Sequence, residues 1–185
     1  MSKNLYIPIV LGSGRKERRS EHAAKYVLER ATAFGQFATE LLDVRDFVTS
    51  PVTERLVDGG GSKRWQEIVQ RADGLIIVAP EYNHSFPGEL KLLLDQLYRE
   101  YHRKPAAICG VSKSSGGTRM TDALRGVLMG IHMVATRTAV HFTNVRELFD
   151  EHGKIKDDSY AEKLEKLFDE LVWYARALKE AREGQ

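Results

Sequence analysis

The sequence of 185 residues has few of the features that secreted, membrane or nucleic-acid-binding proteins show. A single cysteine, Cys109, excludes an internal disulfide and favours a reducing compartment. No apolar run approaches the ~18 residues of a membrane span. Lys and Arg number 28 against 26 Asp and Glu, so no broad basic field favours nucleic acid or a membrane surface. We therefore expect a cytoplasmic protein with neither of these partners.

The chain also shows no signal-peptide pattern, internal repeat or low-complexity tract. Its first apolar run, Leu5–Leu11, is short, contains Pro8 and precedes basic residues where a cleavage site would have small ones. A length of 185 residues with 42% hydrophobic content suits one core, so we expect a single domain over residues 1–185. The segment Val48–Ser62 contains Pro51 and the run Gly59–Gly61, which favour a long loop inside this domain.

Five β-rich runs alternate with five helical patterns along the chain. We expect strands over Leu5–Leu11, Phe37–Asp43, Gly74–Pro80, Pro105–Ser112 and Thr136–Phe142. We expect helices over Ser20–Phe34, Lys63–Arg71, Gly88–Tyr101, Thr118–Val134 and Ser159–Arg182. This alternation predicts an α/β fold in which helices cover both faces of a parallel sheet. Pro8 is unexpected in a central strand, because proline has no N–H for the ladder.

The stretch "LGSGRKERRS", Leu11–Ser20, follows the first expected strand and has the composition of a phosphate-binding loop. A Walker loop is excluded, because Glu17 and Arg18 stand where it needs Gly-Lys. A dinucleotide fingerprint is excluded too, because its third glycine is also replaced by Glu17.

A flavodoxin-type loop remains, which holds one terminal phosphate between the first strand and the first helix. Backbone N–H groups, hydroxyls and the helix dipole bind such a phosphate. Ser13 and Ser20 offer hydroxyls, Arg15 offers charge, and Ser20 is placed to cap the helix. An ordinary polar turn with an N-cap explains the same residues, so this segment alone leaves both interpretations open.

Two further loops are predicted at the same edge of the sheet. "APEYNHSFPGELKLLLDQL", Ala79–Leu97, follows the third strand, and "GVSKSSGGTR", Gly110–Arg119, follows the fourth. Ligands of doubly wound sheets bind outside the carboxyl ends of the strands. The first of these loops contains a proline turn that offers backbone N–H and C=O groups to the polar edge of a flat ring, and its Tyr82 and Phe86 offer apolar cover. The second loop is rich in Gly and Ser, which lets its backbone approach a ligand closely.

Together, "GSGRKERRS", "PEYNHSFPGELKLLLD" and "SSGGTR" resemble the NAD(P)H-dependent FMN reductases of flavodoxin-like fold, which include quinone, azo-dye and chromate reductases. The resemblance covers nearly the whole chain. It implies a doubly wound five-stranded sheet of order 2-1-3-4-5. It also implies FMN as cofactor, NADPH or NADH as hydride donor, a small acceptor such as a flavin, quinone, azo compound or metal oxyanion, and a homodimer or homotetramer.

The resemblance assigns site residues by their place in these motifs. It implies that the FMN phosphate is held by Ser13, Arg15 and Ser20. It implies that the isoalloxazine is bordered by Pro80, Glu81, Tyr82 and Asn83, and by Ser112, Gly116 and Gly117. No catalytic side chain is implied, because the chemistry takes place at flavin N5, and no metal ligands are expected. The sequence departs from the family pattern at Glu21 and Leu92, where asparagine is common, and in a shorter loop after the fourth strand.

Several alternatives remain open for these motifs. The chain could be a flavodoxin-like electron carrier that does not turn over NAD(P)H, or a flavin-free binding module. "GVSKS" approaches a nucleophile elbow, so a serine hydrolase with Ser112, Asp122 and His141 is a further alternative. His84 could donate a proton or be merely solvated. We expect Cys109 to be inert core packing.

Two expectations concern charge and assembly. The 2′-phosphate of NADPH could be attracted by the other basic residues of the first loop, Lys16, Arg18 and Arg19. Tyr98 and Tyr101 lie at the end of an expected helix and could line a subunit contact beside the flavin of a partner chain.

Overall fold

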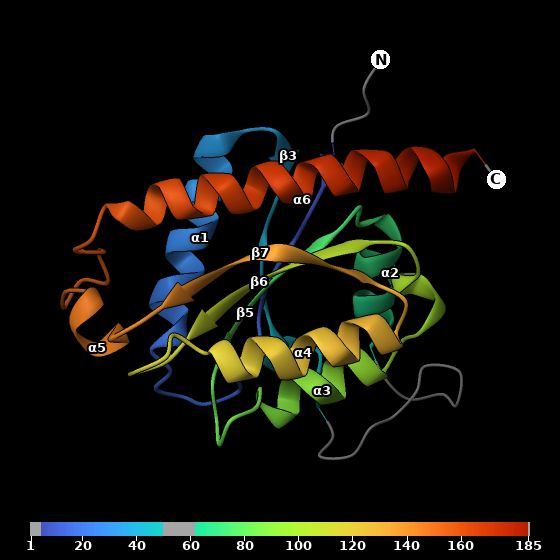
Figure 1. The fold of residues 1–185 in the computed structure, drawn as a ribbon. Helices are drawn as coiled ribbons and strands as arrows, with labels where there is room; N and C mark the ends of the chain where they lie inside the picture. The colour runs from blue at the N-terminus through green and yellow to red at the C-terminus, as the bar shows by residue number, and fades with distance from the viewer. Residues whose placement is uncertain (1–4, 50–61, 185) are drawn as a thin grey trace.

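The computed structural model describes residues 5–49 and 62–184, and a parallel sheet lies at its centre (Figure 1). The sheet contains β2 (Ile9–Leu11), β4 (Leu41–Asp43), β5 (Leu75–Pro80), β6 (Pro105–Val111) and β7 (Val134–Phe142). Its strands lie in the order β4-β2-β5-β6-β7. In terms of the five expected strands this is the order 2-1-3-4-5, so the predicted flavodoxin-like α/β fold class is confirmed.

The first two expected strands are each interrupted. A short pair, β1 (Leu5–Tyr6) and β3 (Phe37–Ala38), precedes β2 and β4 and forms its own parallel ladder. Pro8 lies in the break between β1 and β2, where its missing N–H removes no bond from either ladder. Its carbonyl still accepts a hydrogen bond of 3.0 Å from the N–H of Ile76. The break explains how a proline fits into the middle of the sheet.

Within the described residues, six helices and two 3₁₀ turns connect or follow the strands. They are α1 (Ser20–Phe34), η1 (Val44–Asp46), α2 (Lys63–Arg71), α3 (Gly88–Asp95), η3 (Arg99–Tyr101), α4 (Thr118–Gly130), α5 (Val145–Leu148) and α6 (Ser159–Glu183). The bounds of α1 and α2 are those predicted. The short helix α5 was not predicted, and α4 ends at Gly130 rather than at Val134.

The expected helix Gly88–Tyr101 is wrong in its second half. The helix α3 ends at Asp95, and the backbone of Tyr98 has non-helical angles of φ −143° and ψ −66°. The break lets Tyr101 turn into the core, where it is fully buried and its hydroxyl accepts a hydrogen bond of 2.9 Å from Trp65 Nε1. Tyr101 therefore cannot line a subunit contact, whereas Tyr98 is 43% exposed.

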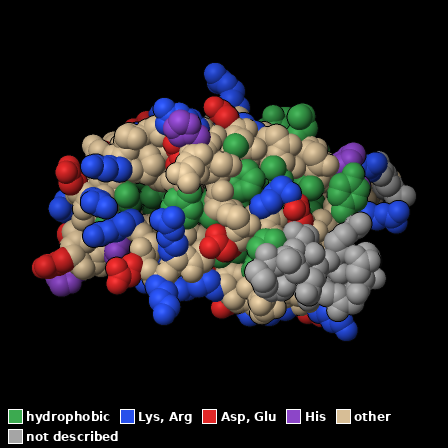
Figure 2. Space-filling model, turned by 90° about the horizontal axis from the view of Figure 1, so that it is seen from below, with side chains coloured by type: hydrophobic (Ala, Val, Ile, Leu, Met, Phe, Trp, Pro, Cys, Tyr) green, Lys and Arg blue, Asp and Glu red, His purple; other side chains and the backbone are tan. Residues whose placement is uncertain are grey.

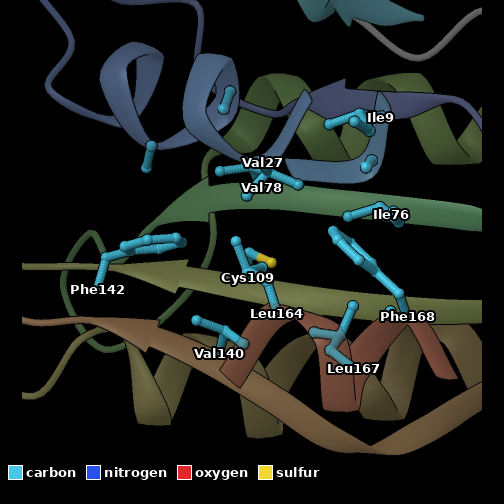
Figure 3. Close-up of a cluster of buried hydrophobic side chains, with 14 of the residues drawn as sticks. Ile9, Val27, Ile76, Val78, Cys109, Val140, Phe142, Leu164, Leu167 and Phe168 are labelled. Atoms are coloured by element: carbon cyan, nitrogen blue, oxygen red, sulfur yellow. The ribbon is translucent and has the colours of Figure 1, made fainter. Parts of the chain in front are cut away.

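The helices cover both faces of the sheet, as expected (Figure 1). On one face, α1 and α6 pack against the strands through side chains such as Val27 and Leu164 (Figure 3). On the other face, α2, α3 and α4 contribute Trp65, Leu93 and Leu124 to a second buried cluster. The loops after β2, β5 and β6 lie at the carboxyl edge of the sheet, outside both covered faces.

Two expectations about the rest of the chain have different outcomes. Cys109 lies on β6 and is fully buried, and this burial raises the pKa of its thiol well above the usual range, which confirms inert packing. Most of the expected loop Val48–Ser62, residues 50–61, lies outside the described residues. Among the helices of the described part, none has the length and hydropathy needed to cross a bilayer.

Candidate active site

The three predicted loops begin side by side at the carboxyl edge of the sheet. The first residue of each loop still bonds to a neighbouring strand. The N–H of Gly12 donates to Val78 O at 2.9 Å, and the N–H of Glu81 donates to Val111 O at 2.9 Å. The loops after β2, β5 and β6 therefore leave the sheet at fixed positions relative to one another.

The loop after β2 and the loop after β5 are joined through Tyr82. The hydroxyl of Ser13 lies 2.9 Å from that of Tyr82, and Ser13 is fully buried. The guanidinium carbon of Arg15 lies 3.7 Å from the centroid of the Tyr82 ring, in cation–π geometry. Two residues predicted to bind phosphate thus contact a residue predicted to border the ring.

Tyr82 begins a tight turn that points two side chains outward. The N–H of Tyr82 donates to Ser85 O at 2.8 Å, and the N–H of Ser85 donates to Tyr82 O at 3.0 Å. The two residues between them, Asn83 and His84, have positive φ values of 49° and 67°, typical of a type I′ turn. Both are exposed at the tip of this turn.

The loop after β5 is joined to the loop after β6 through Glu81. This carboxylate accepts hydrogen bonds of 3.2 Å from the Ser115 hydroxyl and from Arg119 Nη1, and its side chain is only 9% exposed. Burial would raise the pKa of the Glu81 carboxyl, but the hydrogen bonds from Arg119 and Ser115 outweigh it and lower the pKa. Glu81, one of the residues predicted to border the ring, is therefore also a charged link between two loops.

The loop after β6 lies flat on its own strand because of glycines. Gly116 and Gly117 have positive φ values of 64° and 87°. A Cβ on Gly110 would lie 2.4 Å from the carbonyl oxygen of Gly116, which no real side chain could do. This close approach fixes the loop that contains Ser112, whose hydroxyl lies 3.4 Å from that of Ser115.

The residues of the serine hydrolase alternative are not assembled into a triad. His141 lies with Nδ1 3.3 Å from the carbonyl oxygen of Gly116. Asp122 pairs with Arg125, and its side chain is 76% exposed. In the described part of the chain, no hydrogen bond joins Ser112 to His141. The described geometry therefore does not support the hydrolase interpretation.

One arginine of the loop after β2 is a buried structural cation. The Arg18 side chain is 2% exposed and donates to both carboxylate oxygens of Asp43, at the end of β4, and to the carbonyl of Ser13. Burial would raise the pKa of Asp43, but hydrogen bonds from Arg18 and Arg45 hold it well below its usual range. Arg18 is thus committed to Asp43 and is not the free cation expected for a nucleotide phosphate.

The N-cap of α1 is not the residue that the sequence predicts. Arg19, not Ser20, is the N-cap, and no side chain caps this helix. Ser20 is the first helical residue, 1% exposed, and its hydroxyl has no hydrogen-bond partner. A buried hydroxyl without a partner is costly, so its position beside uncapped helix N–H groups fits a phosphate ligand.

A depression of about 560 Å³ lies at this end of α1. It is lined by Lys16, Glu17, Arg18, Arg19, Glu21, His22 and Arg146. The carboxylate of Glu21 is paired with Lys25 at 2.8 Å and lies 3.6 Å from Arg18 Nε. The hydrogen bond from Lys25 contributes most to the lowered pKa of Glu21. Over residues 5–49 and 62–184, no cluster of His, Cys, Asp and Glu has the make-up of a metal site.

Sequence reasoning missed the side chains that join the loops. Asp43 was expected only as the end of a strand, and Ser115 and Arg119 only as part of a Gly/Ser loop. Arg146 was missed because α5 has too few residues to show a helical pattern. The one available signal was the dense charge in "RKERR", of which Arg18 takes an acidic partner, Asp43, from another strand.

The comparison with known families and proteins identifies what the chain is similar to. A family model described as NADPH-dependent FMN reductase matches residues 6–147. A quinone reductase of Pseudomonas putida is 29% identical over 165 residues, which cover 85% of this chain and 88% of the relative. An FMN-dependent NADPH-azoreductase of Staphylococcus haemolyticus is 29% identical over 181 residues, 89% of this chain and 92% of the relative.

A solved structure supports the fold in the same way. The flavoenzyme NAD(P)H:(acceptor) oxidoreductase FerB from Paracoccus denitrificans superimposes with a TM-score of 0.78 at 22% identity. The superposition covers 94% of this chain and 98% of that chain.

Proposed function

Because this chain belongs to the NADPH-dependent FMN reductase family, we propose that it oxidises NADPH or NADH and reduces a small acceptor, with FMN as cofactor. When bound, FMN supplies the hydride chemistry, for which amino-acid side chains have no equivalent. The observation that carries this proposal is the junction of three loops at the carboxyl edge of the sheet, beside the buried, unpartnered hydroxyl of Ser20.

The protein's part in this reaction is to bind and orient. We propose that the phosphate is held by the start of α1, with Ser20, and by the preceding loop, with Ser13 and Arg15. The ring would lie against two groups of residues: Pro80, Glu81, Tyr82 and Asn83, and Ser112, Gly116 and Gly117. Since Ser13 and Arg15 both contact Tyr82, they also fix the phosphate loop relative to the ring loop.

A visible absorbance spectrum followed by NADPH and NADH oxidation assays tests the proposal. A reductase takes up FMN and oxidises a pyridine nucleotide, whereas an electron carrier holds FMN without turnover. A protein that stays colourless after FMN is added would be a flavin-free binding module and would refute the proposal.

The acceptor is proposed from the relatives. Those named quinone reductase and azoreductase make a quinone the first acceptor to assay and an azo dye the second. Free flavin and a metal oxyanion complete the panel. A quinone rate no higher than the rate with oxygen alone would contradict a quinone acceptor.

We propose a homodimer or homotetramer with the flavin site beside the contact, as the family resemblance implies. The contact does not use Tyr101, which is buried. Tyr98 binds His132, which lies between α4 and β7 and so near the amino edge of the sheet, opposite the loops. Light scattering at micromolar concentration measures the mass, and a monomer with full activity would contradict a shared site.

A further inference from the structure

The depression at the start of α1 has cations from two distant parts of the chain. Lys16, Arg18 and Arg19 come from the loop after β2, and Arg146 comes from α5, which follows β7. Lys and Arg side chains gather at this end of the molecule, on the left of Figure 2, where β6 and β7 finish in Figure 1. The depression is therefore flanked by positive charge from two of its sides.

Several charges around the depression are already committed. Arg18 is paired with Asp43, and Glu21 is paired with Lys25. Arg15 lies on the ring of Tyr82 and is not among the lining residues. The N-terminus of α1 remains available to an anion, whereas Ser20, whose hydroxyl is buried, is not among the lining residues. An anion in the depression therefore needs a cation that no other group has claimed.

Arg146 is a cation of this kind, without another partner among the described residues. The N–H of Val145 donates to Ser112 O at 3.4 Å, which ties α5 to the loop after β6. Val145 and Leu148 are buried, so α5 presents Arg146 on its exposed side. Among the described residues, no hydrogen-bond or ion-pair partner of the Arg146 guanidinium is present. A guanidinium binds phosphate through two parallel hydrogen bonds, better than lysine can.

We propose that Arg146 is a further binding residue for a phosphate monoester in this depression. The inference rests on the proposed function, since two such groups would reach the protein: the 5′-phosphate of FMN and the 2′-phosphate of NADPH. It adds a contact from the opposite end of the chain to the loop residues, and it offsets the negative charge of Glu21 beside the site.

The test compares ligands that differ only in the phosphate. In Arg146→Gln, the dissociation constant of FMN should rise ~10-fold, as for one hydrogen bond between charged groups, while that of riboflavin stays within ~2-fold. Flavin fluorescence measures both constants. Arg137→Gln removes the same charge from an exposed site on β7 and should change neither. Arg146→Lys, which keeps the charge, should recover part of the affinity.

A second arm distinguishes the two phosphates. If Arg146→Gln leaves the dissociation constant of FMN unchanged, the FMN-loaded variant should bind NADP⁺ ~10-fold more weakly than wild type and bind NAD⁺ equally well in calorimetry. This result would assign the site to the 2′-phosphate. No change in either arm, or an equal loss for FMN and riboflavin, would overturn the inference. A wild-type protein that binds no FMN refutes the proposed function instead.

In that case, a titration with inorganic phosphate that follows Tm tests Arg146 directly. A rise in Tm of the wild type that R146Q lacks supports the inference, and equal rises overturn it.

Discussion

Replacing Asp43 with alanine tests whether a buried ion pair fixes the loop after β2. The guanidinium of Arg18, with a side chain only 2% exposed, donates to both oxygens of Asp43. Without them it keeps the carbonyl of Ser13 and, as its one charged partner among the described residues, the more distant carboxylate of Glu21, at 3.6 Å. Breaking a buried pair costs about 3–5 kcal/mol. Because Asp43 is 21% exposed, we scale this to about 2–4 kcal/mol of unfolding free energy.

Arg45 provides a matched control for this experiment. It binds the same carboxylate, with Nη2 2.6 Å from Asp43 Oδ2, but its side chain is 45% exposed. Water replaces an exposed partner at little cost, so Arg45→Ala should leave stability almost unchanged. Urea unfolding, followed by the fluorescence of the buried Trp65, measures both variants. The difference between them contains the loss of the pair with Arg18 and the loss of the hydrogen bond that Asp43 accepts from the backbone N–H of Arg45 at the start of η1.

The contribution of Asp43 to the free energy of unfolding should also depend on pH, and it should decrease as the pH is lowered. Burial opposes ionisation of Asp43, but the hydrogen bonds from Arg18 and Arg45 lower its pKa in the folded state well below the unfolded value of about 3.9. Its contribution is therefore complete above about pH 4 and is lost as the pH falls further. A D43A variant no less stable than R45A, or a difference from wild type that does not shrink below about pH 4, would refute this reasoning.

Three further predictions concern binding and packing. Arg15→Ala should weaken FMN binding by about 1.5–3 kcal/mol without abolishing it, because backbone donors remain; unchanged affinity in a fluorescence titration would place the phosphate contact elsewhere. Gly110→Ala should lower stability in urea, because its Cβ would lie 2.4 Å from a backbone oxygen, whereas Gly126→Ala in α4 meets nothing within 4 Å and should add about 0.4–1 kcal/mol. Tyr101→Phe leaves the buried indole N–H of Trp65 without its acceptor and should cost about 1–3 kcal/mol, and an unchanged urea midpoint would show that another acceptor takes over.

The order of elements could be read from the sequence because it depends on local patterns. Helices α1 and α2 begin and end where predicted, and the sheet has the predicted order. Apolar periodicity predicts the bounds of the helices, and the alternation of strands and helices predicts a parallel sheet covered on both faces. The order of the strands was implied by the family resemblance. The end of α3 could not be read in this way, because Tyr101 leaves the helical pattern to reach Trp65, and that contact is tertiary.

The roles of the charges in "RKERR" could not be read for the same reason. Five neighbouring charged residues look alike in sequence, but the fold assigns them to different places. Arg18 is buried because β4 brings Asp43 beside it, and Arg15 lies on Tyr82 because β5 ends next to β2. Such pairings depend on which strands are neighbours, so they follow only after the topology is known.

The links between loops also explain how three irregular segments can form one site. Ser13 joins the first loop to Tyr82, and Glu81 joins the second loop to Arg119. The chain thus orders much of the site when it folds, and a ligand need not supply that conformational entropy when it binds. The same links couple the two ends of the site. A substitution at Tyr82 should therefore disturb the proposed phosphate end as well as the ring end, although Tyr82 is not among the residues that line the depression at α1.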